Sequence, residues 1–293
     1  MQAIHRLEPR EEPHPIDEID PLSRGSLMHE IQFALFSSLR AEGLLPLHQA
    51  DPAETRRRLE RALEQLRGFG ALEAAKWRDL LAPAIERVWL DCVSSILGDL
   101  SEWLRRVSLD AEWIPEEFER SFGLTDAHAR DARSQREPVQ LEGGLQLRGS
   151  IDLVERGETG ALRATDYKSG KRWAQPGIVI DGGKTLQPVL YALALEKLFP
   201  GAKVIGGQLY YCTHTGEYAQ VPVPLDEHAR GAERLLAKTV GEALRDGFFP
   251  AAPRKGECTW CDFLEICGDG QEARAAKKSQ ERLVPLNTLR GSP

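Results

Sequence analysis

Two carboxylates and one amine occur on two segments in which polar and apolar residues alternate. Asp152 lies within residues 138–155, and Asp166 and Lys168 lie within residues 161–168. Alternation with a period of two predicts β-strands, in which successive side chains point to opposite faces. Asp166 and Lys168 therefore point the same way, and a turn between the two strands would bring Asp152 close to them.

The expected hairpin places these three groups within reach of one ion. We expect its turn to pair Glu155 with Ala161. Asp152 then lies diagonal to Asp166, with roughly 7 to 8 Å between the two backbones. The first strand should have a polar face and an apolar face, carrying Arg148, Ser150 and Asp152 on the one and Leu145, Leu147, Ile151 and Leu153 on the other.

The chemistry open to this trio is metal-assisted hydrolysis. Two carboxylates at this spacing repel each other unless a cation neutralises them, and hard oxygen ligands suit Mg²⁺ or Mn²⁺. Such an ion can polarise a phosphate oxygen and lower the pKa of bound water, while Lys168 orients that water or offsets developing charge. The trio therefore predicts phosphodiester hydrolysis, although taken alone it also fits a surface salt bridge on a hairpin.

The composition is that of a folded globular protein. Of the 293 residues, 41% are hydrophobic and 28% are charged, which argues against a disordered or fibrous chain. No run of about 18 apolar residues occurs, and the N-terminus lacks the basic and apolar segments of a secretory signal. A formal net charge of -7 is not that of a nonspecific nucleic-acid binder. We expect a cytoplasmic protein with no membrane partner.

Helical and strand patterns divide the chain into ordered segments. Apolar residues from Leu27 to Leu39 recur four apart, which places them on one face of a helix over 26–39. Asp226 predicts the N-terminal cap of a helix that ends near residue 246. Further helices are expected over 52–66, 73–107 and 186–198, and strands over 113–123, 138–155, 161–168, 203–213 and 217–223.

These segments suggest one domain with flanking pieces. We expect an extended lead-in over 1–23, a domain over 24–272 and a charged tail over 273–293. Within the domain, a helical insertion is expected at about 45–110 and a cysteine-bearing closing loop at 250–268. The abrupt start of the recognisable pattern at residue 24 suggests a fragment of something longer, or the loss of an N-terminal partner segment.

Four short motifs resemble a known group of enzymes. They are RGSLMHE at 24–30, GSID at 149–152, DYKSGK at 166–171 and QPVLY at 187–191. In this order they resemble the PD-(D/E)XK nuclease superfamily, and within it the RecB and AddB-like exonuclease branch, shared with CRISPR adaptation nucleases. The resemblance extends over about 24–268 and implies an α/β fold, in which a central mixed sheet is flanked by helices on both faces.

The resemblance also implies roles for individual residues. His29, Asp152, Asp166 and the backbone carbonyl of Tyr167 would be metal ligands, and Lys168 would be the catalytic lysine. Gln187 and Tyr191, one helical turn apart, would hold DNA or the geometry of the site. Three basic residues near the site are candidates for phosphate contact, and each is equally well explained as a solvated charge: Arg148, Lys171 and Arg172.

Three cysteines near the C-terminus predict a site for a soft metal. Cys258, Cys261 and Cys267 have the spacing C-x2-C-x5-C. In the AddB-like branch this is part of a four-cysteine site for a [4Fe-4S] cluster, whose first cysteine lies upstream of the histidine motif. No cysteine precedes His29, so the three thiols could equally bind Zn²⁺ or nothing. Cys92 lies within an apolar helical stripe, which indicates that it is a core residue.

The sequence therefore predicts a Mg²⁺- or Mn²⁺-dependent deoxyribonuclease, and an exonuclease rather than an endonuclease. The resemblance implies DNA as substrate and a place in a helicase-nuclease repair system, with a partner subunit or an N-terminal region absent from this chain. Two alternatives stay open: a non-catalytic nuclease fold used for DNA binding or assembly, and a site-specific endonuclease on the same core. The intact trio Asp152, Asp166 and Lys168 argues against the first.

Overall fold

A computed structural model describes residues 19–293 apart from 82–84, 126–129, 143, 262 and 269. Most of the predicted lead-in therefore lies outside the described residues. The first helix, α1 (Pro21–Ala41), begins earlier than expected because Pro21 occupies its first turn and the carboxylate of Asp20 accepts the Ser23 N–H at 2.9 Å. None of the described helices has an apolar stretch sufficient to cross a bilayer.

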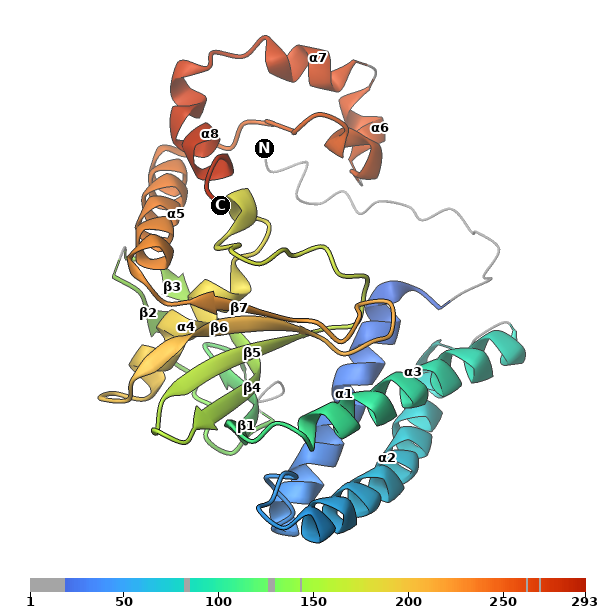
Figure 1. Ribbon diagram of the computed structural model, residues 1–293. Coiled ribbons are helices and arrows are strands. Elements are labelled where there is room, and N and C mark those ends of the chain that lie inside the picture. Colours follow the sequence, from blue (N-terminus) through green and yellow to red (C-terminus); the bar gives the residue numbers. More distant parts are fainter. Residues whose placement is uncertain (1–18, 82–84, 126–129, 143, 262, 269) are drawn as a thin grey trace.

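A mixed five-stranded sheet forms the centre of the molecule (Figure 1), in the order β1-β4-β5-β6-β7. Strands β5 and β6 are parallel, and the other neighbours are antiparallel. The parallel pair is joined through helix α4 (Gln187–Leu198), which is the usual way to connect parallel strands. The strands are β1 (Trp113–Phe122), β4 (Gly149–Gly157), β5 (Leu162–Lys168), β6 (Val204–Tyr211) and β7 (Gln220–Pro224). This confirms the predicted α/β architecture.

Two hydrophobic cores lie on opposite faces of the sheet. On one face, α1 packs with α2 (Pro52–Leu81) and α3 (Glu86–Val107), and the ring of Phe36 lies 5.1 Å from the rings of both Trp103 and Phe118. On the other face, Val154 and Ala164 of the sheet share a core with α4 (Gln187–Leu198) and α5 (Glu227–Asp246). As predicted, Asp226 caps α5 by accepting backbone N–H groups of that helix. The sheet is thus covered on both sides.

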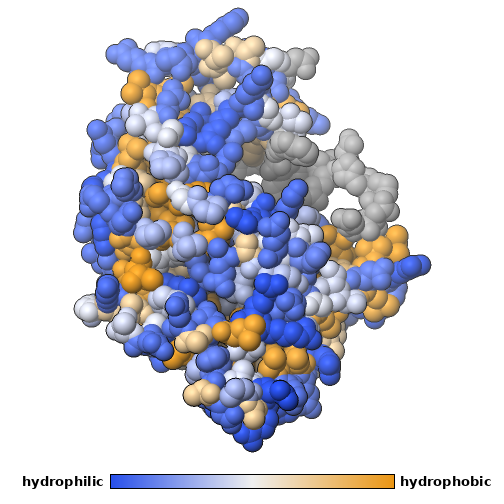
Figure 2. Space-filling view, viewed as in Figure 1, coloured by the Kyte–Doolittle hydropathy of each residue, from blue (hydrophilic) through white to orange (hydrophobic). Residues whose placement is uncertain are grey.

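The predicted helix over 73–107 is wrong in its boundaries. α2 continues to Leu81, and α3 begins at Glu86, on the far side of Pro83. Gly70 lies within α2 and permits a close helix contact, since a Cβ there would lie 2.3 Å from the Leu97 side chain of α3. Figure 2 shows hydrophobic residues at the outer ends of these helices, where Leu80 is exposed.

The predicted strand over 138–155 is also divided. β2 (Val139–Gln140) and β3 (Gln146–Leu147) form a separate small sheet, and only β4 joins the main one. The turn after β4 pairs Glu155 with Arg163, not with Ala161. This register brings Asp152 level with Asp166, since the last pair before them is Leu153 with Thr165.

The C-terminal segment folds back onto the domain. The charged tail over 273–293 contains helical turns, and the Pro293 carbonyl accepts backbone N–H groups from residues 179–181 at 2.7 to 3.2 Å. Gly182, with φ of 58°, allows this approach because a Cβ there would lie 2.5 Å from the Arg290 carbonyl oxygen. The short elements are η3 (Asp181–Gly183), η4 (Glu257–Trp260), α6 (Leu264–Cys267), α7 (Gln271–Ala276), η5 (Glu281–Leu283) and α8 (Val284–Arg290).

Candidate active site

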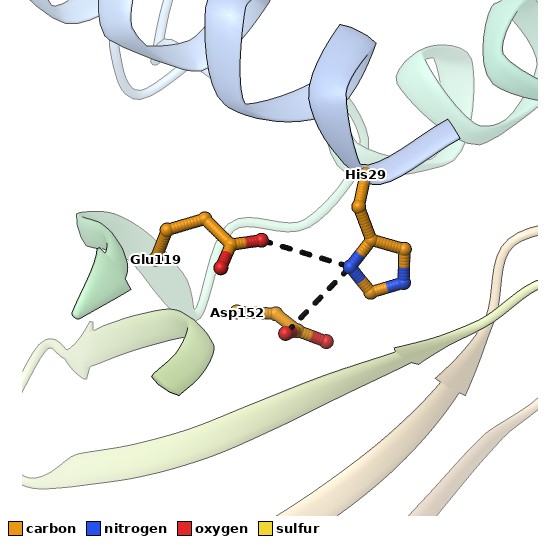
Figure 3. Close-up of side chains that lie close together, drawn as sticks. All are labelled: His29, Glu119 and Asp152. Atoms are coloured by element: carbon orange, nitrogen blue, oxygen red, sulfur yellow. Dashed lines mark ion pairs between the residues drawn. The ribbon is translucent and has the colours of Figure 1, made fainter. Parts of the chain in front are cut away.

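Three side chains from three elements converge between α1 and the sheet (Figure 3). His29 points from α1 toward Glu119 of β1 and Asp152 of β4. Its Nδ1 lies 3.6 Å from Glu119 Oε1 and 3.6 Å from Asp152 Oδ1. One ligand atom from each of the three residues lies within 4.8 Å of the others. All three are only partly buried, so a ligand can reach them from solvent.

The backbone of β1 and β4 departs from regular pleating at this point. The pairs Phe118–Leu153 and Arg120–Ile151 bracket Glu119 and Asp152, and Glu119 has φ of 51°. Ile151 and Leu153 were expected on one face, but they belong to the cores on opposite faces of the sheet. The predicted alternation is wrong here. A non-glycine residue at positive φ is sparsely populated, and such strain gathers at functional sites.

A second group of side chains adjoins this cluster from β5. Asp166 is 3% exposed, and its Oδ2 lies 2.7 Å from Lys168 Nζ. Lys168 Nζ also donates to Gln187 Oε1 at 2.7 Å, from the first residue of α4. The Tyr167 N–H between them donates to Asp152 Oδ2 at 2.8 Å. The structure therefore brings Asp152, Asp166, Lys168 and Gln187 together, and their roles stay predictions.

The charged groups of this site shift one another's pKa values. Burial would lower the pKa of His29, but the negative charges of Asp152 and Glu119 outweigh it and raise that pKa to about 9. Burial raises the pKa of Asp152 to about 7, although the His29 charge opposes the shift. Burial also raises the pKa of Asp166 against the pull of Lys168. The carboxyl of Asp152 therefore holds a proton more tightly than an exposed one would.

This donor set fits a hard divalent cation. Carboxylate oxygens crowded beside an imidazole are unfavourable without a positive charge among them, and Mg²⁺ and Mn²⁺ take such ligands. His29, Glu119 and Asp152 could hold the ion, with Asp166 adjoining them. The ligand role of the Tyr167 carbonyl stays a prediction.

Glu119 is the site residue that the sequence did not reveal. It lies in a stretch with several other glutamates, residues 113–123, and nothing in that stretch distinguishes it. Only its register against β4 places it opposite Asp152. Its carboxylate also accepts a hydrogen bond from Ser150 at 3.0 Å. The signal that could have identified Glu119 is the pairing of its strand with the strand that carries Asp152.

The predicted DNA-contacting residues have varied surroundings. The Tyr191 ring packs edge-on against Phe122 at 6.4 Å, and burial raises the pKa of its hydroxyl. Arg148 and Lys171 are exposed, whereas Arg172 pairs with Glu217 at 3.3 Å. Their contacts with DNA stay predictions.

The three cysteines of the closing loop do not complete a [4Fe-4S] site. Cys258, Cys261 and Cys267 are free thiols in one short segment, but they form no metal-binding set within the part of the chain that the structure describes. Cys92 packs at the edge of the α1–α3 core, as expected, and Cys212 is buried after β6. No fourth thiolate joins them among the described residues, so these three thiols alone do not fit a [4Fe-4S] cluster.

Comparison with known proteins agrees with this geometry. The chain is 31% identical over 161 residues to a CRISPR-associated exonuclease Cas4/endonuclease Cas1 fusion from Myxococcus xanthus (strain DK1622), a match that covers 53% of this chain and 27% of that protein. The chain thus spans about a quarter of the length of this relative. A sequence profile of the PD-(D/E)XK nucleases matches residues 1–268. With nearly its whole length matched and the motif residues gathered at one site, the chain belongs to the PD-(D/E)XK nuclease superfamily.

Proposed function

We propose that this protein is a metal-dependent deoxyribonuclease that hydrolyses phosphodiester bonds. The observation that carries the proposal is the convergence of His29, Glu119 and Asp152 on one small volume, with the Asp166–Lys168 pair beside it. Membership of a nuclease superfamily supports the same reaction. A nuclease fold that served only as a scaffold would have no need of this costly concentration of charge.

In this proposal, some site residues hold an ion and Lys168 stabilises the transition state. A divalent ion, when bound, polarises a phosphate oxygen and lowers the pKa of bound water. His29, Glu119, Asp152 and Asp166 would hold that ion. Lys168 would offset the negative charge that develops on the phosphate, with its Nζ positioned by Asp166 and Gln187. The Tyr167 N–H fixes the orientation of Asp152 by a hydrogen bond.

We propose further that the enzyme is an exonuclease. The Myxococcus relative is named as an exonuclease fused to an endonuclease, and the match covers only part of it. The motifs at 24–30 and 187–191 support the RecB and AddB-like branch, and with it a helicase-nuclease repair system and a partner subunit. A soft metal on the three cysteines would be a separate structural feature. An anaerobically purified sample that lacks both absorbance near 400 nm and stoichiometric iron would argue against a cluster.

A cleavage assay separates the candidate functions. Linear and closed circular DNA are incubated with Mn²⁺ and the wild type, Asp166→Asn, or the control Asp91→Asn, whose carboxylate is exposed on α3. Nucleotide release from linear DNA only, lost in Asp166→Asn and kept in the control, is the expected result. Cutting of circular DNA at defined positions would indicate an endonuclease. Equal background release by wild type and Asp166→Asn would leave only the non-catalytic scaffold.

A further inference from the structure

Trp173 is an exposed tryptophan on the segment that follows the strand of Asp166 and Lys168. Its side chain is 46% exposed, whereas Trp89 and Trp103 are 3% and 0% exposed. An exposed indole on this segment offers a flat aromatic face on which a nucleobase can stack. We propose that Trp173, with Lys171, forms a base-stacking subsite for single-stranded DNA, an inference that rests on the proposed function.

The backbone beneath this indole is held in place. The Ala174 N–H donates to the Tyr211 hydroxyl at 3.2 Å, and Ala174 is fully buried beside Tyr211 and Leu209. The Arg172 Nε donates to the Ala174 carbonyl at 3.2 Å. A side chain on a fixed backbone loses little conformational entropy when it binds, which favours its use as a rigid stacking surface.

The position of Trp173 relates it directly to the candidate active site. Tyr211 of β6 pairs with Lys168 of β5, and paired residues on neighbouring strands point to the same face. The segment from Lys168 to Trp173 spans at most about 18 Å when fully extended. The indole therefore lies within reach of a few nucleotides of a strand whose phosphate lies at Lys168.

The charges beside Trp173 suit a nucleic-acid backbone. Lys171 is exposed and has no ion-pair partner among the described residues, while Arg172 is already paired with Glu217 at 3.3 Å. An ammonium free to contact a phosphate next to an aromatic face is the combination used by single-strand binding surfaces. Duplex DNA offers no free base face, because its bases are already stacked. The subsite therefore selects single strands or frayed ends, with little preference for base sequence.

Binding measurements without cleavage test this proposal. A dye-labelled oligothymidine and a blunt duplex of equal length are titrated in EDTA with the full-length wild type, Trp173→Ala and Trp173→Phe. The expected result is a roughly 5- to 150-fold weaker affinity of Trp173→Ala for the single strand, the fold-change that corresponds to one lost stacking contact. Duplex affinity should change less than about twofold on the same scale, and Trp173→Phe should recover most of the loss.

Two controls make the outcome decisive. Phe249→Ala removes another exposed aromatic, 54% exposed and far along the chain, and should leave both affinities unchanged. Quenching of tryptophan emission by the oligothymidine should fall in Trp173→Phe. The proposal is overturned if Trp173→Ala binds the single strand as the wild type does, or loses both DNAs equally. A failure of the proposed function itself would show separately, as wild-type protein that binds DNA but does not cleave it with Mn²⁺.

Discussion

At the scale of single residues, the site combines a base and acids whose protonation depends on one another. His29 lies 3.6 Å from both Glu119 and Asp152, so its positive charge and their negative charges stabilise each other. Protons and the proposed divalent ion would compete for the same atoms, because metal ligands must be deprotonated. The pH should therefore govern both metal affinity and stability.

The first prediction concerns this pH dependence. The pKa of His29 is raised from 6.5 to about 9, so its stabilisation is complete below pH 6.5 and is lost as the pH rises through 9. The pKa of Asp152 is raised from 3.8 to about 7, so ionising it in the folded state costs stability as the pH rises through 7. In EDTA, the free energy of unfolding should fall between about pH 4 and 9.

Denaturant titrations at several pH values measure this slope. Asp152→Asn should flatten the decrease in the free energy of unfolding below pH 8. His29→Gln should flatten the decrease above pH 7, because each variant removes the group that titrates in that range. Calorimetry should show Mn²⁺ binding more tightly at pH 8.5 than at pH 6.5, with proton release. A free energy of unfolding that rises with pH in the metal-free wild type would contradict the assigned proton distribution.

At the scale of elements, one carboxylate joins the helical region to the end of β5. Asp99 of α3 accepts from Arg24 Nη2 at 2.8 Å and from the His214 N–H at 2.9 Å. Arg24 Nη1 in turn donates to the carbonyl of Ser169, the residue after Lys168, at 3.2 Å. The insertion thus braces the strand end that presents Lys168, the proposed catalytic lysine.

The second prediction is that Asp99→Asn lowers kcat about tenfold or more, with KM for DNA little changed, because Lys168 loses its fixed position. The free energy of unfolding should fall by about 1 to 3 kcal/mol, the cost of a broken charged hydrogen bond that is partly exposed. Steady-state cleavage and denaturant titration measure the two effects.

The control for this change is Asp131→Asn. Asp131 pairs with Arg40 at 3.3 Å near the other end of α1 and is also buried, but none of its described contacts reaches β5. This variant should lose stability and keep its kcat. If both variants lower kcat in proportion to their loss of stability, Asp99 has a purely structural role.

At the scale of the whole molecule, the C-terminal segment closes the fold at a distance from the site. Leu289 of α8 is 6% exposed in the core shared with α4 and α5, and Pro293 holds residues 179–181 through backbone hydrogen bonds. A largely apolar pocket of about 460 Å³, open to solvent, lies between α5 and α8. The segment therefore contributes to stability without touching the charged cluster.

The third prediction follows from this separation. Leu289→Ala should lower the free energy of unfolding by about 2 to 4 kcal/mol, through lost burial and a new cavity. Val284→Ala, 56% exposed on the same helix, should change it by less than about 0.5 kcal/mol. Cleavage activity below the unfolding transition should stay within about twofold of wild type in both. A selective loss of activity in Leu289→Ala would show that α8 acts on the site.

Local patterns in the sequence predicted most elements, and the resemblance of four motifs to a nuclease family supplied most of the candidate site residues. Helical and strand periodicities depend on neighbouring residues only, which is why β1, β5, α4 and α5 were found close to their observed bounds. The structure brings the motif residues His29, Asp152, Asp166, Lys168 and Gln187 together.

Tertiary contacts decided the rest. The β4–β5 register differs from the expected one by two residues, because pairing depends on which side chains each face must bury. Gly70 lies within a helix because Leu97 packs against it, a contact between distant residues that no local pattern contains. Glu119 joins the site only through the pairing of β1 with β4. The sequence by itself determined the chemical groups and the local elements, whereas long-range packing determined which groups meet.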